Sequence, residues 1–165
     1  MKISKTSRVT SGLLFFLFLL PAVADTLQGR VVRVIDGDTV VVLDAGKEQH
    51  RVRLAGIDAP ERKQPFGQKS KQYLAFQIAG QDVVVDWHKH DRYHRIVGKI
   101  IHDGQDVDLG MVRAGLAWWY RKYAHEQSPA DRVLYEDAEN KARAQRRGLW
   151  VDPHPVPPWQ WRHRR

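Results

Sequence analysis

The sequence has 165 residues and a formal net charge of +8 at pH 7, with 42% hydrophobic and 28% charged residues. This balance excludes collagen, a long coiled coil, wholesale disorder and a multi-span membrane protein, and the length is that of one domain with a sizeable core. Cysteine is missing, which excludes a disulfide framework, a thiol nucleophile and a thiolate zinc site. The excess of positive charge favours an anionic partner.

The first 24 residues have the pattern of a secretory signal peptide. Three basic residues within the first eight are followed by the apolar run 12–20 and by an Ala-Val-Ala cleavage pattern at 22–24. The apolar run is too short for a bilayer core, which needs about 20 residues. We therefore predict cleavage after Ala24 and a secreted or periplasmic protein without membrane attachment, with an uncleaved anchor as the alternative.

Three strands are expected next in the chain. β-branched residues crowd Thr26–Ile35, a second β run covers Thr39–Leu43, and apolar residues alternate with arginines in Gln49–Ala55. The sequence Asp-Ala-Gly-Lys at 44–47 is a turn between two strands. Three consecutive strands of this kind predict an antiparallel meander.

A helix and two further strands follow the meander. Apolar residues four apart in Gly67–Ala79 indicate a helix that ends at Gly80, and the β pattern returns in Asp82–Trp87 and Arg95–His102.

Two more helices are expected before the tail. Asp106–Ala114 is a short helix with Asp106 or Asp108 as its N-cap, and Gly115 lies just past its end. Ser128 can cap a third helix that runs through Gln145 and is stopped by Gly148. Its predicted apolar stripe consists of Leu134, Ala138 and Ala142.

The order of these elements predicts an α+β protein, a five-stranded OB-type Greek-key barrel with three helices. The predicted organisation is a signal peptide at 1–24, an OB-fold domain at 25–150 and a tail at 151–165. The tail holds four prolines, two tryptophans and three arginines, so we expect no regular element in it. It either lies extended against the domain or is free. Its aromatic and basic residues suit single-stranded nucleic acid, and packing of the tryptophans on the barrel is the alternative.

The first chemical candidate is the sequence Asp-Gly-Asp at 36–38, between the first two strands. Such a tripeptide is most often only a turn. An EF-hand is excluded, because the twelfth position of that loop, where a bidentate glutamate is needed, is Lys47.

The second candidate is Arg53 inside a strand, followed by Asp58 and Glu61. A buried arginine is costly unless an anion meets it, so either a salt bridge to Glu61 or a phosphate contact is expected. The third candidate is Asp-Arg-Tyr-His-Arg at 91–95, which by itself is a polar turn.

Together these segments suit phosphodiester cleavage. Asp38 and Asp58 offer carboxylates to a hard cation, Glu61 can activate water, and Arg53 and Arg95 can stabilise the negative charge of the transition state. Oxygen ligands without cysteine favour Ca²⁺, Mg²⁺ or Mn²⁺. Histidines at 88, 90 and 94 suggest zinc, but the intervening Lys and Arg residues repel a cation and favour a phosphate contact or a solvated strand end.

These motifs resemble the staphylococcal nuclease (thermonuclease) family. The matching segments are VIDGDTV at 34–40, RLAGIDAPE at 53–61, DRYHR at 91–95 and MVRAGLA at 111–117, in the same order. The resemblance implies an OB-type barrel and a nuclease that uses one Ca²⁺ ion to cleave DNA and RNA, leaving 3′-phosphate ends. A monomer without a stable protein partner is expected.

The resemblance also implies roles for single residues. Asp38 and Asp58 match direct metal ligands, Ala59 stands where a backbone carbonyl reaches the metal and the nuclease has threonine, and Asp36 matches an acid just outside the metal shell. Glu61 matches the proposed general base. Phosphate-binding arginines are matched by Arg53 and Arg95, and contacts to the terminal phosphate by Arg92 and Tyr93.

Three departures from the family affect these expectations. His94 stands where the nuclease has glycine, so this turn is expected to need another backbone shape. The loop after Glu61 is shorter. The aromatic region at 118–123 has the family's tyrosine-rich placement but different residues. Within it Tyr123 best fits the base-stacking position, and a place in the core is equally open.

Two other classes of protein remain as alternatives. A non-catalytic OB-fold nucleic-acid-binding module would bind in a salt-dependent way without cleavage. The presence of all the acids and arginines named above favours the nuclease. An envelope-anchored interaction protein that uses the tail would require an uncleaved signal.

Overall fold

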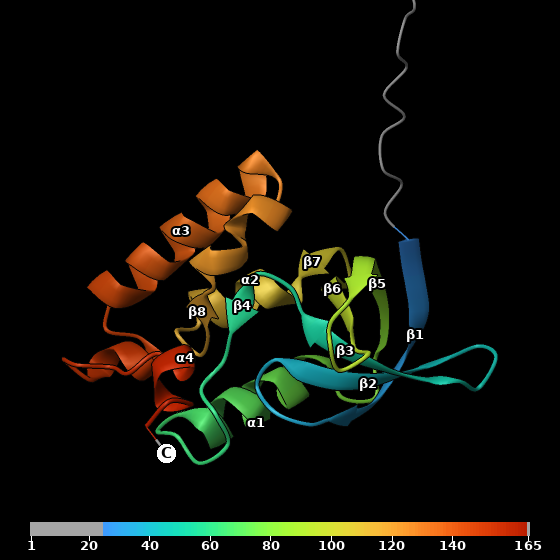
Figure 1. Cartoon of the computed structure of the whole chain (residues 1–165), viewed down its shortest axis with the longest axis horizontal. Coiled ribbons are helices and arrows are strands. Elements are labelled where there is room, and N and C mark those ends of the chain that lie inside the picture. The colour runs from blue at the N-terminus through green and yellow to red at the C-terminus, as the bar shows by residue number, and fades with distance from the viewer. Residues whose placement is uncertain (1–24, 165) are drawn as a thin grey trace, which may run out of the picture.

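The computed structural model describes residues 25–164 (Figure 1). The predicted signal peptide lies outside the described residues. Within residues 25–164, no helix is long and apolar enough to cross a membrane.

Five strands form a barrel. They are β1 (Asp25–Val34), β2 (Thr39–Asp44), β3 (Gln49–Leu54), β5 (Asp82–His90) and β6 (Ile96–His102). β1, β2 and β3 make the predicted antiparallel meander, and β5 joins the free edge of β1 and then pairs with β6. A parallel pairing between β3 and β6 closes the ring. The predicted OB-type α+β fold is therefore confirmed.

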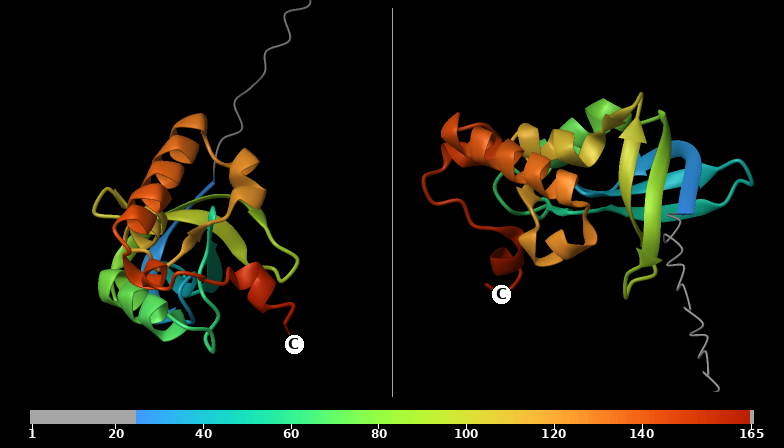
Figure 2. Two further views of the ribbon diagram at one scale, coloured as in Figure 1. Left: turned by 90° about the vertical axis from the view of Figure 1, so that its left-hand side faces the viewer. Right: turned by 90° about the horizontal axis from the view of Figure 1, so that it is seen from above.

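Helices gather at one side of the barrel (Figure 2). The three longest are α1 (Gly67–Ile78), α2 (Val107–Arg113) and α3 (Pro129–Ala144). α1 packs on β1 and α2, and α2 lies between β6 and α3. The shorter elements are β4 (Ile57–Asp58), β7 (Gln105–Asp106), β8 (Trp118–Trp119), the 3-10 helices η1 (Arg121–Glu126) and η2 (Gly148–Val151), and α4 (Pro158–Trp161).

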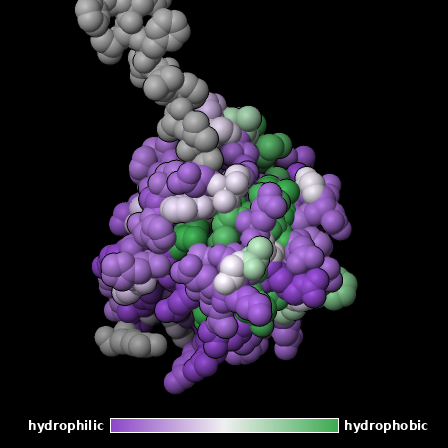
Figure 3. Space-filling view, turned by 90° about the vertical axis from the view of Figure 1, so that its right-hand side faces the viewer, coloured by the Kyte–Doolittle hydropathy of each residue, from purple (hydrophilic) through white to green (hydrophobic). Residues whose placement is uncertain are grey.

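One hydrophobic core joins the barrel to the helices. It includes Val40, Val42, Val52 and Ile100 from the strands and Leu74 from α1, all fully buried. A second, smaller cluster lies under the tail and contains Trp118, Ala142, Leu149 and Trp150, with Trp159 packed against it. Figure 3 shows the barrel side of the molecule, opposite the helices. Hydrophobic residues in the middle of this face are surrounded by hydrophilic ones.

Local signals placed most helix ends correctly. Asp106 caps α2 by accepting a hydrogen bond from the Leu109 amide, and Ser128 caps α3 by accepting one from the Asp131 amide. The helix ends at Ala144, and the chain then turns at Arg146 and Gly148, both with positive φ.

Three predictions about these elements are wrong. Leu134 is 47% exposed, and the buried stripe of α3 contains Tyr135 instead, because its hydroxyl reaches the Asp106 carboxylate at 3.0 Å and so satisfies a buried polar group. β5 extends to His90, because a register shift between Trp87 and Lys89 interrupts the alternation without ending the strand. The tail does contain a regular element, α4, because Pro158 is its first residue, where proline is tolerated.

Candidate active site

The candidate catalytic residues meet at one end of the β2–β3 ribbon. Asp38 directly precedes β2, and Arg53 is the residue of β3 that pairs with Thr39, the first residue of β2. Antiparallel pairing thus brings two residues 15 positions apart next to each other. Asp58 is the last residue of β4. It pairs with Trp118 of β8, and this pairing holds it beside Asp38 and Arg53.

Arg53 joins the two carboxylates that were predicted as metal ligands. Its Nη2 atom lies 3.0 Å from Asp58 Oδ1 and 3.2 Å from Asp38 Oδ2. Asp38 Oδ2 also accepts a hydrogen bond of 2.6 Å from the amide of Ala59. Asp38 and Asp58 are buried, at 7% and 1% exposed. Since the acids that meet Arg53 are these two, the alternative salt bridge from Arg53 to Glu61 is wrong.

Asp36 adds a third acid to this buried group. Its Oδ1 accepts a hydrogen bond of 3.1 Å from the amide of Asp38. Burial, together with the charge of Asp38, raises the pKa of Asp36 to about 6, and burial also raises the pKa of Asp58. Three acids around Arg53 leave an excess of negative charge, and their oxygen atoms are the ligands that hard cations prefer. In charge and donor chemistry, the residues therefore fit a hard divalent cation.

Gly37 is required by close packing. A Cβ at this position would lie 2.8 Å from the Cβ of Ala59 and 2.8 Å from that of Ser70. Ser70 is fully buried and donates a hydrogen bond of 2.7 Å to the carbonyl of Leu116. The Asp-Gly-Asp sequence is thus a turn that also fixes two carboxylates against the start of α1.

Arg95 reaches the same site from the turn between β5 and β6. Its Nε donates to Asp91 Oδ2 at 2.7 Å, and its Nη1 lies 3.4 Å from Thr39 Oγ1. The Thr39 hydroxyl in turn donates to Asp38 Oδ1 at 3.2 Å. Asp91 therefore positions Arg95, a role that sequence reasoning missed although the two residues are only four apart.

The other residues of this turn lie at the rim of the site. Arg92 Nη2 donates to the Tyr93 hydroxyl at 2.6 Å, and the Arg95 guanidinium lies 5.4 Å from the centre of the Tyr93 ring. Tyr93 is 56% exposed and so is accessible to a ligand. His94 has φ 58°, the left-handed conformation that glycine favours. His94 therefore adopts, despite its Cβ, a backbone shape that glycine takes readily.

Tyr123 lies outside the core. It is 37% exposed in η1, an element without buried residues, and its ring meets Tyr120 edge-on with centroids 5.0 Å apart. The ammonium of Lys89 lies 5.2 Å from the ring centre. The alternative that Tyr123 is a core residue is thus wrong, and its ring is open to a ligand on a basic surface.

Glu61 has a partner that sequence reasoning did not find. Arg162 Nη1 lies 2.8 Å from Glu61 Oε1, and Arg162 Nη2 lies 2.8 Å from Asp58 Oδ2. Arg162 directly follows α4 in the tail, 101 residues away from Glu61. No local pattern predicts such a contact, since it depends on how the tail folds back.

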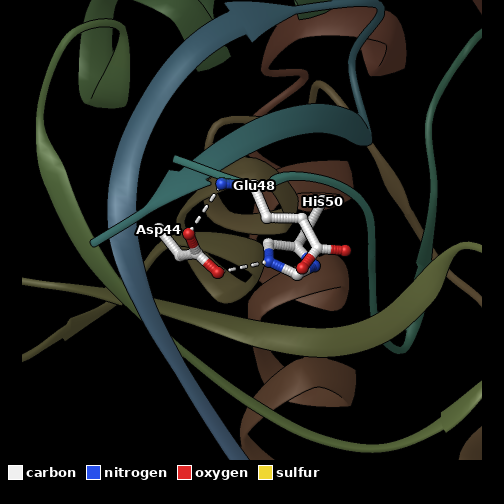
Figure 4. Close-up of side chains that lie close together, drawn as sticks. All are labelled: Asp44, Glu48 and His50. Atoms are coloured by element: carbon white, nitrogen blue, oxygen red, sulfur yellow. Dashed lines mark hydrogen bonds and ion pairs between the residues drawn. The ribbon is translucent and has the colours of Figure 1, made fainter. Parts of the chain in front are cut away.

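A second group of polar side chains lies at the other end of the β2–β3 ribbon (Figure 4). Asp44, Glu48 and His50 have potential metal-ligating atoms within 4.8 Å of one another. Asp44 accepts hydrogen bonds of 2.8 Å from the Glu48 amide and from His50 Nε2. The group lies roughly 20 Å from Asp38, the length of a six-residue strand, so it is separate from the candidate active site. Within the described residues, the histidines at 88, 90 and 94 form no comparable group.

Comparison with known proteins finds relatives over most of the chain. Residues 51–152 match the family described as staphylococcal nuclease homologue. The chain is 47% identical over 154 residues to an uncharacterized endonuclease of Escherichia coli, with 93% of this chain and 96% of that protein covered. It is 40% identical over 164 residues to a micrococcal nuclease of Shigella flexneri, with 94% of this chain and 91% of that protein covered. An uncharacterized endonuclease of Haemophilus influenzae is 38% identical over 160 residues, with 97% of this chain and 86% of that protein covered.

Proposed function

We propose that this nuclease is exported and depends on Ca²⁺. The chain belongs to the staphylococcal nuclease family, and the proposal starts from that membership. The enzyme hydrolyses phosphodiester bonds of DNA and RNA and leaves 3′-phosphate ends. The observation that carries the proposal is the pair of buried carboxylates, Asp38 and Asp58, that share one nitrogen of Arg53. This arrangement places acids and a guanidinium where a cation and a phosphate can meet.

The oxygen atoms for one Ca²⁺ ion come from Asp38, Asp58 and the backbone carbonyl of Ala59, with Asp36 just outside. The burial of Asp38 and Asp58 on one guanidinium nitrogen supports this assignment, because buried carboxylates that lie close together favour a cation. When bound, the ion supplies positive charge that stabilises the additional negative charge of the transition state. Ca²⁺ accepts oxygen ligands in flexible geometry, which suits a mixed set of carboxylates and a carbonyl.

The chain's own side chains carry the remaining chemistry. Glu61 takes a proton from a water molecule, whose oxygen attacks phosphorus while the bond from phosphorus to the 5′ oxygen breaks. The leaving 5′ oxygen takes up a proton from solvent water, so the products are a 5′-hydroxyl and a 3′-phosphate. Arg53 and Arg95 donate hydrogen bonds to the phosphate oxygens as negative charge builds up.

Residues at the rim bind the rest of the substrate. Arg92 and Tyr93 contact a terminal phosphate, and Tyr123 stacks on a base. Exposure of the Tyr93 and Tyr123 rings beside basic side chains supports these roles. Substitution of Tyr93 by Phe should reduce the preference for a 5′-phosphorylated oligonucleotide over its unphosphorylated form, and an unchanged preference would contradict the assignment.

Export rests on the signal-like pattern of residues 1–24. Mass spectrometry of the exported protein should find a chain that begins at Asp25. A chain that still begins at Met1 would instead support the anchored form. Light scattering of the exported protein should give the mass of a monomer.

A digestion assay on denatured DNA tests the proposed chemistry. Purified residues 25–165 are incubated with Ca²⁺, with Ca²⁺ plus chelator, and with Glu61→Gln in place of the original chain. We expect cleavage that requires both Ca²⁺ and Glu61. If Glu61→Gln cuts equally well, the site is wrong, and salt-dependent binding without cleavage would replace the nuclease by a binding module.

A further inference from the structure

The C-terminal segment, residues 155–164, folds back onto the candidate active site. After η2 it turns toward β8, where α4 lies (red in Figure 1). The carbonyl of Val156 accepts a hydrogen bond of 2.6 Å from Gln64 Nε2, three residues beyond Glu61. Pro157 and Pro158 are buried, so this part of the segment is packed against the domain.

Aromatic contacts hold the C-terminal segment next to the carboxylates. Trp159 stacks on Tyr120, with centroids 5.2 Å apart and ring planes 9° from parallel. Trp159 also meets Trp118 edge-on at 5.6 Å. Since Trp118 pairs with Asp58 across β4 and β8, these contacts fix the segment beside a predicted metal ligand.

In this position, the Arg162 guanidinium is hydrogen-bonded to both Asp58 and Glu61. Its Nη2 donates to Asp58 Oδ2 at 2.8 Å, and its Nη1 donates to Glu61 Oε1 at 2.8 Å and to Asp58 Oδ1 at 3.3 Å. Asp58 Oδ1 also accepts from Arg53 at 3.0 Å. Both oxygens of Asp58 are therefore engaged by guanidinium groups, and so is an oxygen of Glu61.

We propose that the C-terminal segment is an internal inhibitor, in which the guanidinium of Arg162 competes with the divalent cation for Asp58. Among the described residues, Asp58 Oδ2 accepts a hydrogen bond from Arg162 alone, and a cation bound to this oxygen would lie close to the guanidinium, so charge repulsion displaces Arg162. The same displacement frees Glu61 to accept a proton. This inference rests on the proposed function, because it takes Asp58 to be a ligand of Ca²⁺.

Three features make the C-terminal segment suited to release. The Arg162 side chain is 42% exposed, whereas that of Asp58 is 2% exposed, so the arginine enters the site from solvent. The helix that carries it has only four residues. Trp159 is partly exposed rather than enclosed in the core. The segment can therefore leave without unfolding the barrel.

Calorimetric titration with Ca²⁺, without nucleic acid, tests the inference. The proteins are residues 25–165 and the variants Arg162→Ala and Trp159→Ala, with Arg164→Ala as the matched control because Arg164 is an exposed arginine two positions on. We expect Arg162→Ala to bind Ca²⁺ roughly tenfold more tightly, in the range of typical coupling between sites. Trp159→Ala should shift the affinity in the same direction while the guanidinium is kept, and Arg164→Ala should leave it unchanged.

A fluorescence titration gives a second measurement on the same proteins. Ca²⁺ should change the tryptophan emission of the original chain as Trp159 separates from Tyr120, and this change should be much smaller in Trp159→Ala. Thermal midpoints close to that of the original chain confirm that the variants are folded.

The outcomes separate this inference from the proposed function. If Ca²⁺ binds all four proteins with equal affinity, or binds Arg162→Ala more weakly, the inhibitor proposal is wrong while the metal site stands. If none of the proteins binds Ca²⁺, the metal assignment is wrong and the inference fails with it.

Discussion

The two ends of the β2–β3 ribbon carry similar side chains in opposite electrostatic situations. At the active-site end, Asp36, Asp38 and Asp58 are largely enclosed and surround Arg53. At the hairpin end, Asp44 pairs with His50 and with the Glu48 amide near solvent. Burial, together with the charge of Asp38, raises the pKa of Asp36, whereas the hydrogen bond from His50 lowers the pKa of Asp44. Burial and the mutual repulsion of the carboxylates, rather than closeness alone, therefore distinguish the acids of the candidate active site.

Removal of the Arg53 guanidinium should have the largest effect on stability. Arg53→Gln leaves Asp38 and Asp58 buried without this partner, which typically costs about 3–5 kcal/mol. His50→Gln at the hairpin end should cost much less, since that pair is closer to solvent. Urea unfolding of the Ca²⁺-free proteins measures both. A loss below about 1 kcal/mol for Arg53→Gln would show that the active-site end is well solvated.

Removal of the proposed base should affect activity and leave stability nearly unchanged. Glu61→Gln should lower kcat by about 10²–10³, a typical cost of losing one charged group that acts in the transition state. Its side chain is 40% exposed, so the thermal midpoint should stay close to the original. Glu48→Gln is the control at the hairpin end and should keep full activity. A large loss of stability in Glu61→Gln would instead indicate a structural role.

The two ends should respond to pH with opposite signs when Ca²⁺ is absent. The pKa of Asp36 rises from 3.8 to about 6 on folding, so its contribution to stability is present below pH 3.8 and is lost as the pH rises through 6. The pKa of Asp44 is lowered, so its contribution is present above 3.8 and is lost as the pH falls.

Unfolding in urea at several pH values measures this difference. Above pH 6, Asp36→Asn should be more stable than the original chain by on the order of 2 kcal/mol, and the gain should vanish near pH 3. Asp44→Asn should be less stable at neutral pH and equal to the original in acid. The same sign for both variants would contradict the contrast between the two ends.

The smallest effects should come from backbone conformation. His94 and Lys47 both adopt positive φ, at 58° and 64°, in the turns that adjoin the active site and the hairpin end. Glycine avoids the cost of this conformation, so His94→Gly and Lys47→Gly should each gain about 0.5–1 kcal/mol in thermal unfolding. Both variants should keep their activity. A loss confined to His94→Gly would show that this side chain contacts the substrate.

Local patterns in the sequence were sufficient for most of the fold. Runs of β-branched residues predicted β1 and β2, alternation predicted β3, and capping residues predicted the starts of α2 and α3. Each of these signals acts over a few residues. In the stripe of α3, Ala138 and Ala142 are buried as predicted, but Tyr135 takes the place of Leu134, because its burial depends on a hydroxyl contact with Asp106 from another element.

The residues of the candidate site could likewise be predicted from the sequence only in part. Asp38, Arg53 and Asp58 could be predicted to lie together from motifs in a known order, and the structure places them on one guanidinium. Asp91 was overlooked because its sequence context is that of an ordinary turn. Arg162 could not be predicted, because its neighbours in the chain carry no signal of the acids that it meets.

The sequence by itself determined the strands, the helix caps, the family resemblance and the chemical character of the site, because all of these depend on residue types and short spacings. Only the tertiary structure decided the charge balance of that site. The pKa of Asp36, the sharing of Arg53 and the contact from Arg162 depend on burial and on distances between segments far apart in the chain. Electrostatic energies depend on those distances and on exclusion of water, and neither is fixed until the chain has folded.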